Sequence, residues 1–198
     1  MNRNFSKTVL RLGALALGLW VYLPAAAFSQ DHAKEHGKEK AKKQSKEQMK
    51  MAMTKAVAVL NPTQGNTAQG VVTFTQEEGG VHIVAKFTGV PKGEHGFHIH
   101  EFGDCSAPDG ASAGSHFNPK GAVHAGREAE KRHMGDMGNV AADEQGNIAL
   151  DYVDKHIKIS AIIGRGMILH ANPDDFTTQP TGNAGGRIAC GVIGVGKP

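Results

Sequence analysis

The sequence GFHIHEFGDC spans Gly96 to Cys105 and places two histidines, His98 and His100, on either side of a β-branched residue. If this segment is a strand, side chains alternate with a period of two, so both imidazoles share one face and Ile99 points to the other. The rise along a strand puts the two rings roughly 6–7 Å apart, which lets both bind one cation. For this motif alone, two exposed strand histidines are the alternative explanation.

Segments with strand character lie on both sides of this motif, and turn-forming residues separate them. They alternate or run apolar over residues 54–60, 71–76, 81–87, 139–142, 147–153, 157–163, 167–170 and 188–195. No segment has a convincing helical period, and the 26 glycines suit tight turns. The pattern predicts an all-β fold, a single antiparallel Greek-key barrel or sandwich of about eight strands in residues 54–198, with long metal-binding and active-site loops.

A long segment without periodicity, from Phe102 to about Asp136, contains a second set of ligand-type residues. These residues are His116, His124, His133 and Asp136, with the spacing H-x7-H-x8-H-x2-D. Three imidazoles and one carboxylate are a complete tetrahedral ligand set for Zn²⁺, and bound metal would keep so long a loop ordered.

The histidines are too numerous for one metal ion. His98, His100 and His170, counted together with the loop ligands, give six histidines and one aspartate. Two adjacent sites can use all of them if one histidine binds both ions through its two ring nitrogens. His116 is the candidate for this bridge because it comes first in the loop.

Four motifs, GFHIHEFGDC, GSHFNP, RHMGDMGN and GNAGGRIACGVIG, resemble those of the copper–zinc superoxide dismutase family in order and spacing. The resemblance covers residues 54–198. It implies an enzyme that converts superoxide to dioxygen and hydrogen peroxide as an antioxidant, with one copper and one zinc per subunit. It implies copper ligands His98, His100, His116 and His170, and zinc ligands His116, His124, His133 and Asp136.

The resemblance also implies roles for residues outside the ligand sets. His116 is expected to carry a proton during catalysis. Asp174 matches a carboxylate that accepts hydrogen bonds from His98 and His124. Arg187 matches the arginine that binds the substrate anion, and a structural arginine bonded to loop carbonyls is its alternative.

Two further histidines, His95 and His156, match no ligand position and are predicted to lie on the surface. The family forms dimers through different faces in different branches, so the resemblance does not define the oligomeric state, and a homodimer is one of the states considered. Cys105 directly follows Gly103 and Asp104, which resembles bacterial members. The segment before Arg187 lacks the acidic and lysine cluster of eukaryotic members, so long-range steering of superoxide is not implied.

Residues 1–27 have the build of a secretory signal peptide. A basic start is followed by an apolar run from Leu12 to Leu23 and by small residues at 25–27. The run is short for a membrane span and no later segment approaches one, so no membrane insertion is expected after cleavage. We therefore predict export to the periplasm, with full secretion as the alternative.

The two cysteines, Cys105 and Cys190, fit an exported chain. An even count in an oxidising compartment favours a disulfide, which would close a loop of 85 residues. Two buried free thiols are the alternative from the count alone, and the family resemblance implies the same disulfide pair.

Residues 28–53 are predicted to be a disordered tether rich in Lys, Glu, His and Met. Thioethers and imidazoles bind Cu(I). A second hypothesis is therefore an exported copper-binding or copper-delivery protein that meets a copper donor through this tether. The simpler explanation is a linker in which these Met and His residues are incidental. The residues concerned are His32, His36, Met49, Met51 and Met53.

The charge is unevenly distributed along the chain. Residues 28–55 hold eight Lys against four acidic residues, whereas residues 56–198 hold eleven basic against fifteen acidic residues. The predicted folded part is therefore mildly acidic, and binding to nucleic acid is not expected.

Overall fold

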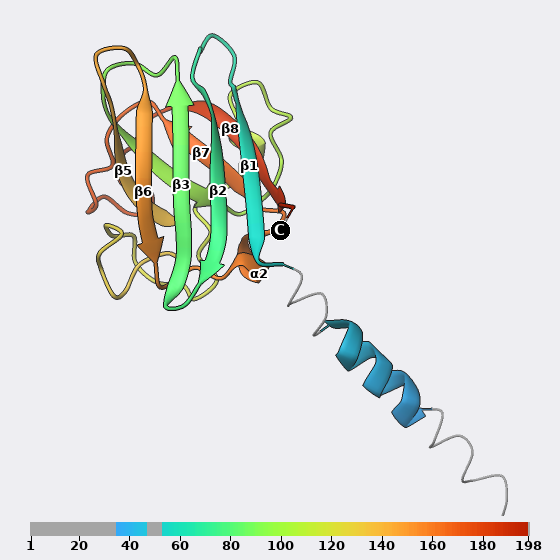
Figure 1. The fold of residues 1–198 in the computed structure, drawn as a ribbon. Helices are drawn as coiled ribbons and strands as arrows, with labels where there is room; N and C mark the ends of the chain where they lie inside the picture. Colours follow the sequence, from blue (N-terminus) through green and yellow to red (C-terminus); the bar gives the residue numbers. More distant parts are fainter. Residues whose placement is uncertain (1–34, 47–52, 198) are drawn as a thin grey trace, which may run out of the picture. The chain divides into compact units, whose positions relative to one another are not determined.

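The computed structural model describes residues 35–46 and 53–197 (Figure 1). Within 53–197 the chain forms eight strands, one short helix and one 3₁₀ turn. The strands are β1 (Lys55–Pro62), β2 (Gln69–Glu77), β3 (Gly80–Thr88), β4 (Gly93–His100), β5 (Asp136–Ala142), β6 (Ile148–Asp154), β7 (Gly166–His170) and β8 (Arg187–Val195). The 3₁₀ turn is Ala111–Ala113 and the helix, α2, is Ile159–Ile162.

The strands pair antiparallel throughout, in the order β5-β4-β7-β8-β1-β2-β3-β6. The two end strands of this order, β5 and β6, follow each other in the chain and lie side by side, so the sheet curls into a nearly closed barrel (Figure 1). The connections from β3 to β4 and from β6 to β7 join strands that do not pair, as in a Greek key. The predicted all-β barrel of eight strands is confirmed.

Alternating side chains form the barrel core. On β3, Val81, Ile83, Ala85 and Phe87 are buried, while the intervening residues are more exposed. Because each strand contributes one apolar face, the core fills the inside of the barrel and the outside faces water.

Strands β4 and β7 break this alternation, since they are buried on both faces. The six residues 95–100 of β4 and all five residues of β7 are buried. On β4, Phe97 and Ile99 join the core, so His98 and His100 lie on the outer face. Loop residues, including His116, cover that face, and the histidines are therefore shielded from water.

One predicted strand is wrong. The apolar segment 157–163 contains the short helix α2 instead of a strand. Asp154 accepts hydrogen bonds from the backbone N–H groups of His156 and Ile157, at 2.7 and 3.2 Å, and this turns the chain away from the end of β6. Ile159 and Ile162, three residues apart, then bury the same face of the helix.

Residues 35–46, which lie within the predicted tether, form a helix with every residue exposed. Lys, Glu, Ala and Gln favour helices, and Glu39 has the spacing to pair with Lys43. The predicted signal peptide, His32, Met49 and Met51 lie outside the described residues. In the part of the chain that is described, no helix has the length and apolar character needed to cross a membrane.

Candidate metal centre

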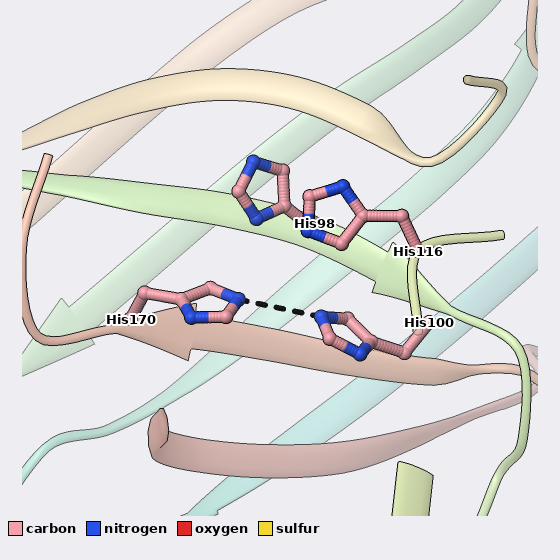
Figure 2. Close-up of side chains that lie close together, drawn as sticks. All are labelled: His98, His100, His116 and His170. Atoms are coloured by element: carbon pink, nitrogen blue, oxygen red, sulfur yellow. Dashed lines mark hydrogen bonds between the residues drawn. The ribbon is translucent and has the colours of Figure 1, made fainter. Parts of the chain in front are cut away.

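Four histidines that the sequence analysis assigned to one site come together on the outer face of β4 and β7. His98 and His100 extend from β4, His170 ends β7, and His116 comes from the loop that pairs with His100 (Figure 2). We call these residues the four-histidine cluster; all are buried, and one nitrogen of each lies within 4.8 Å of the others. The ring centroids of His98 and His100 lie 6.5 Å apart, as the strand spacing predicted.

Each histidine of this cluster uses one ring nitrogen on its outer side. His98 Nε2 bonds Asp174 Oδ2 and His116 Nδ1 bonds Asp136 Oδ1, at 2.8 and 2.9 Å. The Nδ1 atoms of His100 and His170 bond backbone carbonyl oxygens, at 2.9 and 3.3 Å. Since these partners are acceptors, the outer nitrogens carry the hydrogens and the four inner nitrogens carry lone pairs.

The inner nitrogens have no adequate partner of their own. Within residues 35–46 and 53–197, His98 Nδ1 and His116 Nε2 are buried without a hydrogen bond. His100 Nε2 and His170 Nε2 lie 3.3 Å apart and can share a hydrogen bond in one tautomer (Figure 2). When their Nδ1 atoms carry the hydrogens, as the carbonyl partners require, both Nε2 atoms present lone pairs to each other. Four converging lone pairs without donors fit a bound cation, because a metal ion accepts them all.

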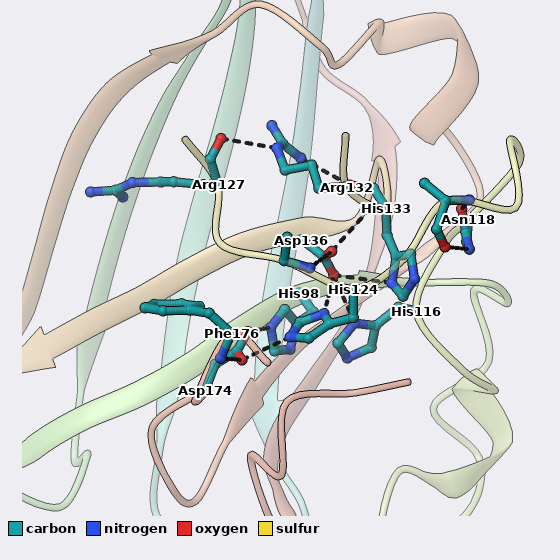
Figure 3. Close-up of polar contacts among 12 residues, drawn as sticks. His98, His116, Asn118, His124, Arg127, Arg132, His133, Asp136, Asp174 and Phe176 are labelled. Atoms are coloured by element: carbon teal, nitrogen blue, oxygen red, sulfur yellow. Dashed lines mark hydrogen bonds and ion pairs between the residues drawn. The ribbon is translucent and has the colours of Figure 1, made fainter. Parts of the chain in front are cut away.

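The second cluster centres on Asp136, the first residue of β5. The Nδ1 atoms of His116, His124 and His133 lie 2.9, 3.0 and 3.2 Å from Asp136 Oδ1 (Figure 3). We call these four residues the Asp136 cluster; all are buried, and their ligand atoms also lie within 4.8 Å of one another. Three imidazoles and a carboxylate at this spacing have the donor set of a tetrahedral zinc site.

His116 belongs to both clusters. Its Nδ1 faces Asp136, while its Nε2 faces the four-histidine cluster. The number of ligand-type residues in the sequence predicts two sites with a shared histidine, and the structure brings all seven residues together in this way.

Asp174 connects the two clusters by accepting hydrogen bonds from one histidine of each. Its Oδ2 accepts a hydrogen bond from His98 and its Oδ1 accepts one from His124, both at 2.8 Å, as the resemblance implied (Figure 3). Asn139, which the sequence analysis missed, holds the backbone of Asp174: its side chain accepts from Asp174 N at 2.7 Å and donates to Asp174 O at 2.9 Å. The signal available in the sequence was its place in the RHMGDMGN motif.

The protonation of these residues follows from burial and from the two aspartates. Burial lowers the pKa of His98 to about 4 and holds the pKa values of His100 and His170 well below 6.5. Burial also opposes protonation of His124, but hydrogen bonds to Asp136 and Asp174 outweigh it and raise its pKa to about 9. His98, His100 and His170 are therefore neutral at pH 7 in the absence of metal, and neutral imidazole is the form that binds metal ions.

Arg187, at the start of β8, is half-buried beside the four-histidine cluster. Its two terminal nitrogens donate to the backbone oxygens of Gly110 and Gly114, and Gly114 O also accepts from His100 Nδ1. The structural role given as an alternative is therefore present. Its positive charge also contributes to the lowered pKa values of His100 and His170, which places that charge within reach of the cluster.

The predicted disulfide between Cys105 and Cys190 is present. It joins the loop after β4 to β8, three residues beyond Arg187. The loop that supplies the carbonyls for Arg187 is thus covalently attached to the strand that carries this arginine.

His95 is the one predicted surface residue that the structure contradicts. It is 2% exposed, with Nδ1 2.8 Å from the carbonyl oxygen of His170 and Nε2 2.7 Å from that of Pro91. The period of two that separates His98 from Ile99 also places His95 on the core side, so the signal was present in the sequence. His156 is exposed, as predicted.

These features together define a β-barrel with two adjoining buried clusters of metal-ligand type that share one histidine. The family model of copper/zinc superoxide dismutase (SODC) matches residues 68–193, and the chain belongs to this family. The family normally binds copper and zinc, and both clusters can hold metal ions. A crystal structure of the clock protein EA4 is similar, with 45% sequence identity, a TM-score of 0.66, and coverage of 73% of this chain and 96% of that chain.

Proposed function

We propose that this protein dismutates superoxide with copper in the four-histidine cluster and zinc in the Asp136 cluster. Two superoxide anions and two protons give one dioxygen and one hydrogen peroxide, since one anion loses the electron that the other gains. The observation that carries the proposal is the pair of buried clusters joined through His116, with inner nitrogens that lack donors.

The assignment of metals rests on the two donor sets. His98, His100, His116 and His170 offer four nitrogens, which suit copper, whereas the Asp136 cluster offers three nitrogens and one oxygen, which suit zinc. Copper bound by nitrogen supplies one-electron exchange between Cu(II) and Cu(I), while zinc supplies a fixed charge and holds the loop.

His116 and Arg187 are the residues of this chain that act on the substrate. His116 Nε2 makes no hydrogen bond to any described residue. Whenever this atom is not bound to copper it can hold a proton and donate it to the peroxide product, while Nδ1 stays on the zinc side. Arg187 lines a cavity of about 270 Å³ together with Asp109 and Gly185. Its guanidinium, fixed by the carbonyl oxygens of Gly110 and Gly114, offers a small anion a positive charge.

Pulse radiolysis of superoxide with copper- and zinc-loaded protein tests this function. We expect fast turnover in the parent protein and a loss of at least about 100-fold in His170→Ala, because removing one of four nitrogens disrupts the copper site. His156→Ala, which removes an exposed histidine, is the matched control and should keep full activity. Tight copper binding without turnover in the parent would contradict the proposal and favour the copper-delivery alternative.

We also propose export to the periplasm, based on the signal-like residues 1–27, and a homodimeric mature protein, as the family leads us to expect. Cell fractionation with N-terminal mass analysis tests the first, and analytical ultracentrifugation tests the second.

The copper-delivery alternative can be tested on the tether of residues 28–53. If the protein loads copper equally well with and without these residues when copper is limiting, copper uptake through the tether is ruled out.

A further inference from the structure

The loop formed by residues 174–182 holds His124 at its main chain as well as at its ring. The Gln179 side-chain amide lies against the peptide groups of His124: His124 N donates to Gln179 Oε1 at 2.8 Å, and Gln179 Nε2 donates to His124 O at 2.9 Å. The main chain of His124 presents one donor, its N–H, and one acceptor, its carbonyl oxygen. The primary amide of Gln179 pairs with both because it has an acceptor oxygen and a donor nitrogen.

The loop fixes the position of this amide through its own hydrogen bonds. The Asp175 carboxylate accepts from the backbone of Thr177 and Thr178, at 2.9 and 2.8 Å, and from the Thr178 hydroxyl at 2.6 Å. These bonds, those from Thr178 foremost, lower the pKa of Asp175 to about 2. Gly182 closes the loop, since its N–H donates to Thr178 O and its carbonyl accepts from Asp175 N.

The same loop holds the other end of His124, because Asp174 accepts a hydrogen bond from its Nε2 (Figure 3). The backbone and the ring of one candidate zinc ligand are therefore fixed by a single segment that lies about 50 residues further along the chain. A ligand fixed at both ends keeps its Nδ1 directed at Asp136 Oδ1, 3.0 Å away.

We propose that Gln179 is a positioning residue of the zinc site, which sets the backbone of His124 and thereby increases zinc affinity. This inference rests on the proposed function insofar as His124 binds zinc. The hydrogen bonds of the Gln179 side chain go to the main chain of His124 and to Thr177 O, so its effect on the zinc ligands passes through His124. Zinc binding should depend on it more strongly than copper binding does, because the inner nitrogens of His98, His100 and His170 receive no contact from Gln179.

The test compares Gln179→Met, which keeps the length of the side chain and removes both hydrogen bonds, with the parent protein. We expect zinc affinity to fall about 10-fold, since partners that orient a metal ligand contribute about 10- to 100-fold. Chelator competition measures zinc and copper affinities separately, and Co(II) in the zinc site reports its ligand geometry through its visible absorption. We expect a changed Co(II) spectrum and a copper affinity within about 3-fold of the parent.

Two further variants complete the experiment. Gln179→Glu retains the acceptor for His124 N and loses the donor, so its zinc affinity should fall between those of the parent and Gln179→Met. Gln145→Met removes an exposed glutamine from the turn after β5 and should bind zinc like the parent.

Three results would count against these assignments in different ways. Zinc affinity of Gln179→Met and Gln179→Glu equal to the parent's would overturn the positioning role and leave the proposed function intact. An equal loss of both metals with a lower unfolding midpoint would also overturn it, because that result indicates general destabilisation. A parent protein that binds no zinc would contradict the proposed function itself.

Discussion

The disulfide between Cys105 and Cys190 should supply a large part of the stability of the metal-free protein. The bond closes a loop of 85 residues, and the chain-entropy relation for a loop of that length gives about 4.5 kcal/mol. Replacing both cysteines by alanine, which avoids a leftover thiol, should therefore lower the free energy of unfolding by about this amount.

Urea unfolding of the metal-free protein measures this loss without a contribution from metal binding. With a slope of about 2 kcal/mol per M, a loss of about 4.5 kcal/mol lowers the unfolding midpoint by about 2 M. The same variant, loaded with copper and zinc, should lose dismutation activity. The loop that it frees carries Gly110 and Gly114, whose carbonyl oxygens hold the Arg187 guanidinium in place.

Ser112→Ala is the matched control within the same loop. Its hydroxyl donates to Asp104 O at 2.8 Å and accepts from Ala107 N at 3.1 Å, so its loss should cost about 1–2 kcal/mol. The reasoning is refuted if the double-alanine variant unfolds within about 1 kcal/mol of the parent. It is equally refuted if Ser112→Ala costs as much as the disulfide, since packing of the loop would then account for the stability.

Three further predictions follow from the surroundings of the metal centre. Gly182 has φ +67°, and a Cβ there would overlap Asp174 Oδ1; Gly182→Ala should weaken zinc binding about 10- to 100-fold in chelator competition, and an unchanged affinity would contradict this. The pKa of His98 is lowered to about 4 in the folded protein from 6.5, so between these pH values only the unfolded chain gains this proton. The metal-free protein should lose about 3 kcal/mol of stability from His98 as pH falls from 6.5 to 4, and a flat urea midpoint over that range would show that the cluster is not buried and neutral. Arg132 and Asp154 form a buried ion pair at 2.6 Å; Arg132→Met leaves the carboxylate uncompensated and should cost about 3–5 kcal/mol in urea unfolding, whereas a loss under about 1 kcal/mol would mean that the pair contributes little.

Much of the fold and of the metal centre was predictable because it depends on local patterns. The period of two along β4 placed His98 and His100 on one face, and the strand rise gave their separation. Counting donors against the needs of four-coordinate ions then indicated two sites and one shared histidine, and the place of His116 at the start of the loop made it the candidate for the bridge.

The remaining features depend on contacts between distant segments, which local patterns do not encode. Asn139 meets Asp174 across 35 positions and Gln179 meets His124 across 55, because the loop before β8 lies over the metal-binding loop. The segment 157–163 was ambiguous for another reason: a short apolar run suits a strand or a buried helix, and here the carboxylate of Asp154 selects the helix.

The most direct test of the account concerns the bridge formed by His116. Protein loaded with Cu(II) in both clusters should be measured by electron paramagnetic resonance at neutral pH, with copper content determined on the same sample. If His116 binds both ions through its two nitrogens, the two Cu(II) spins couple and the signal is much weaker than two independent ions would give. A full-intensity signal from two uncoupled Cu(II) ions would contradict the shared ligand and, with it, the two-site centre proposed for superoxide dismutation.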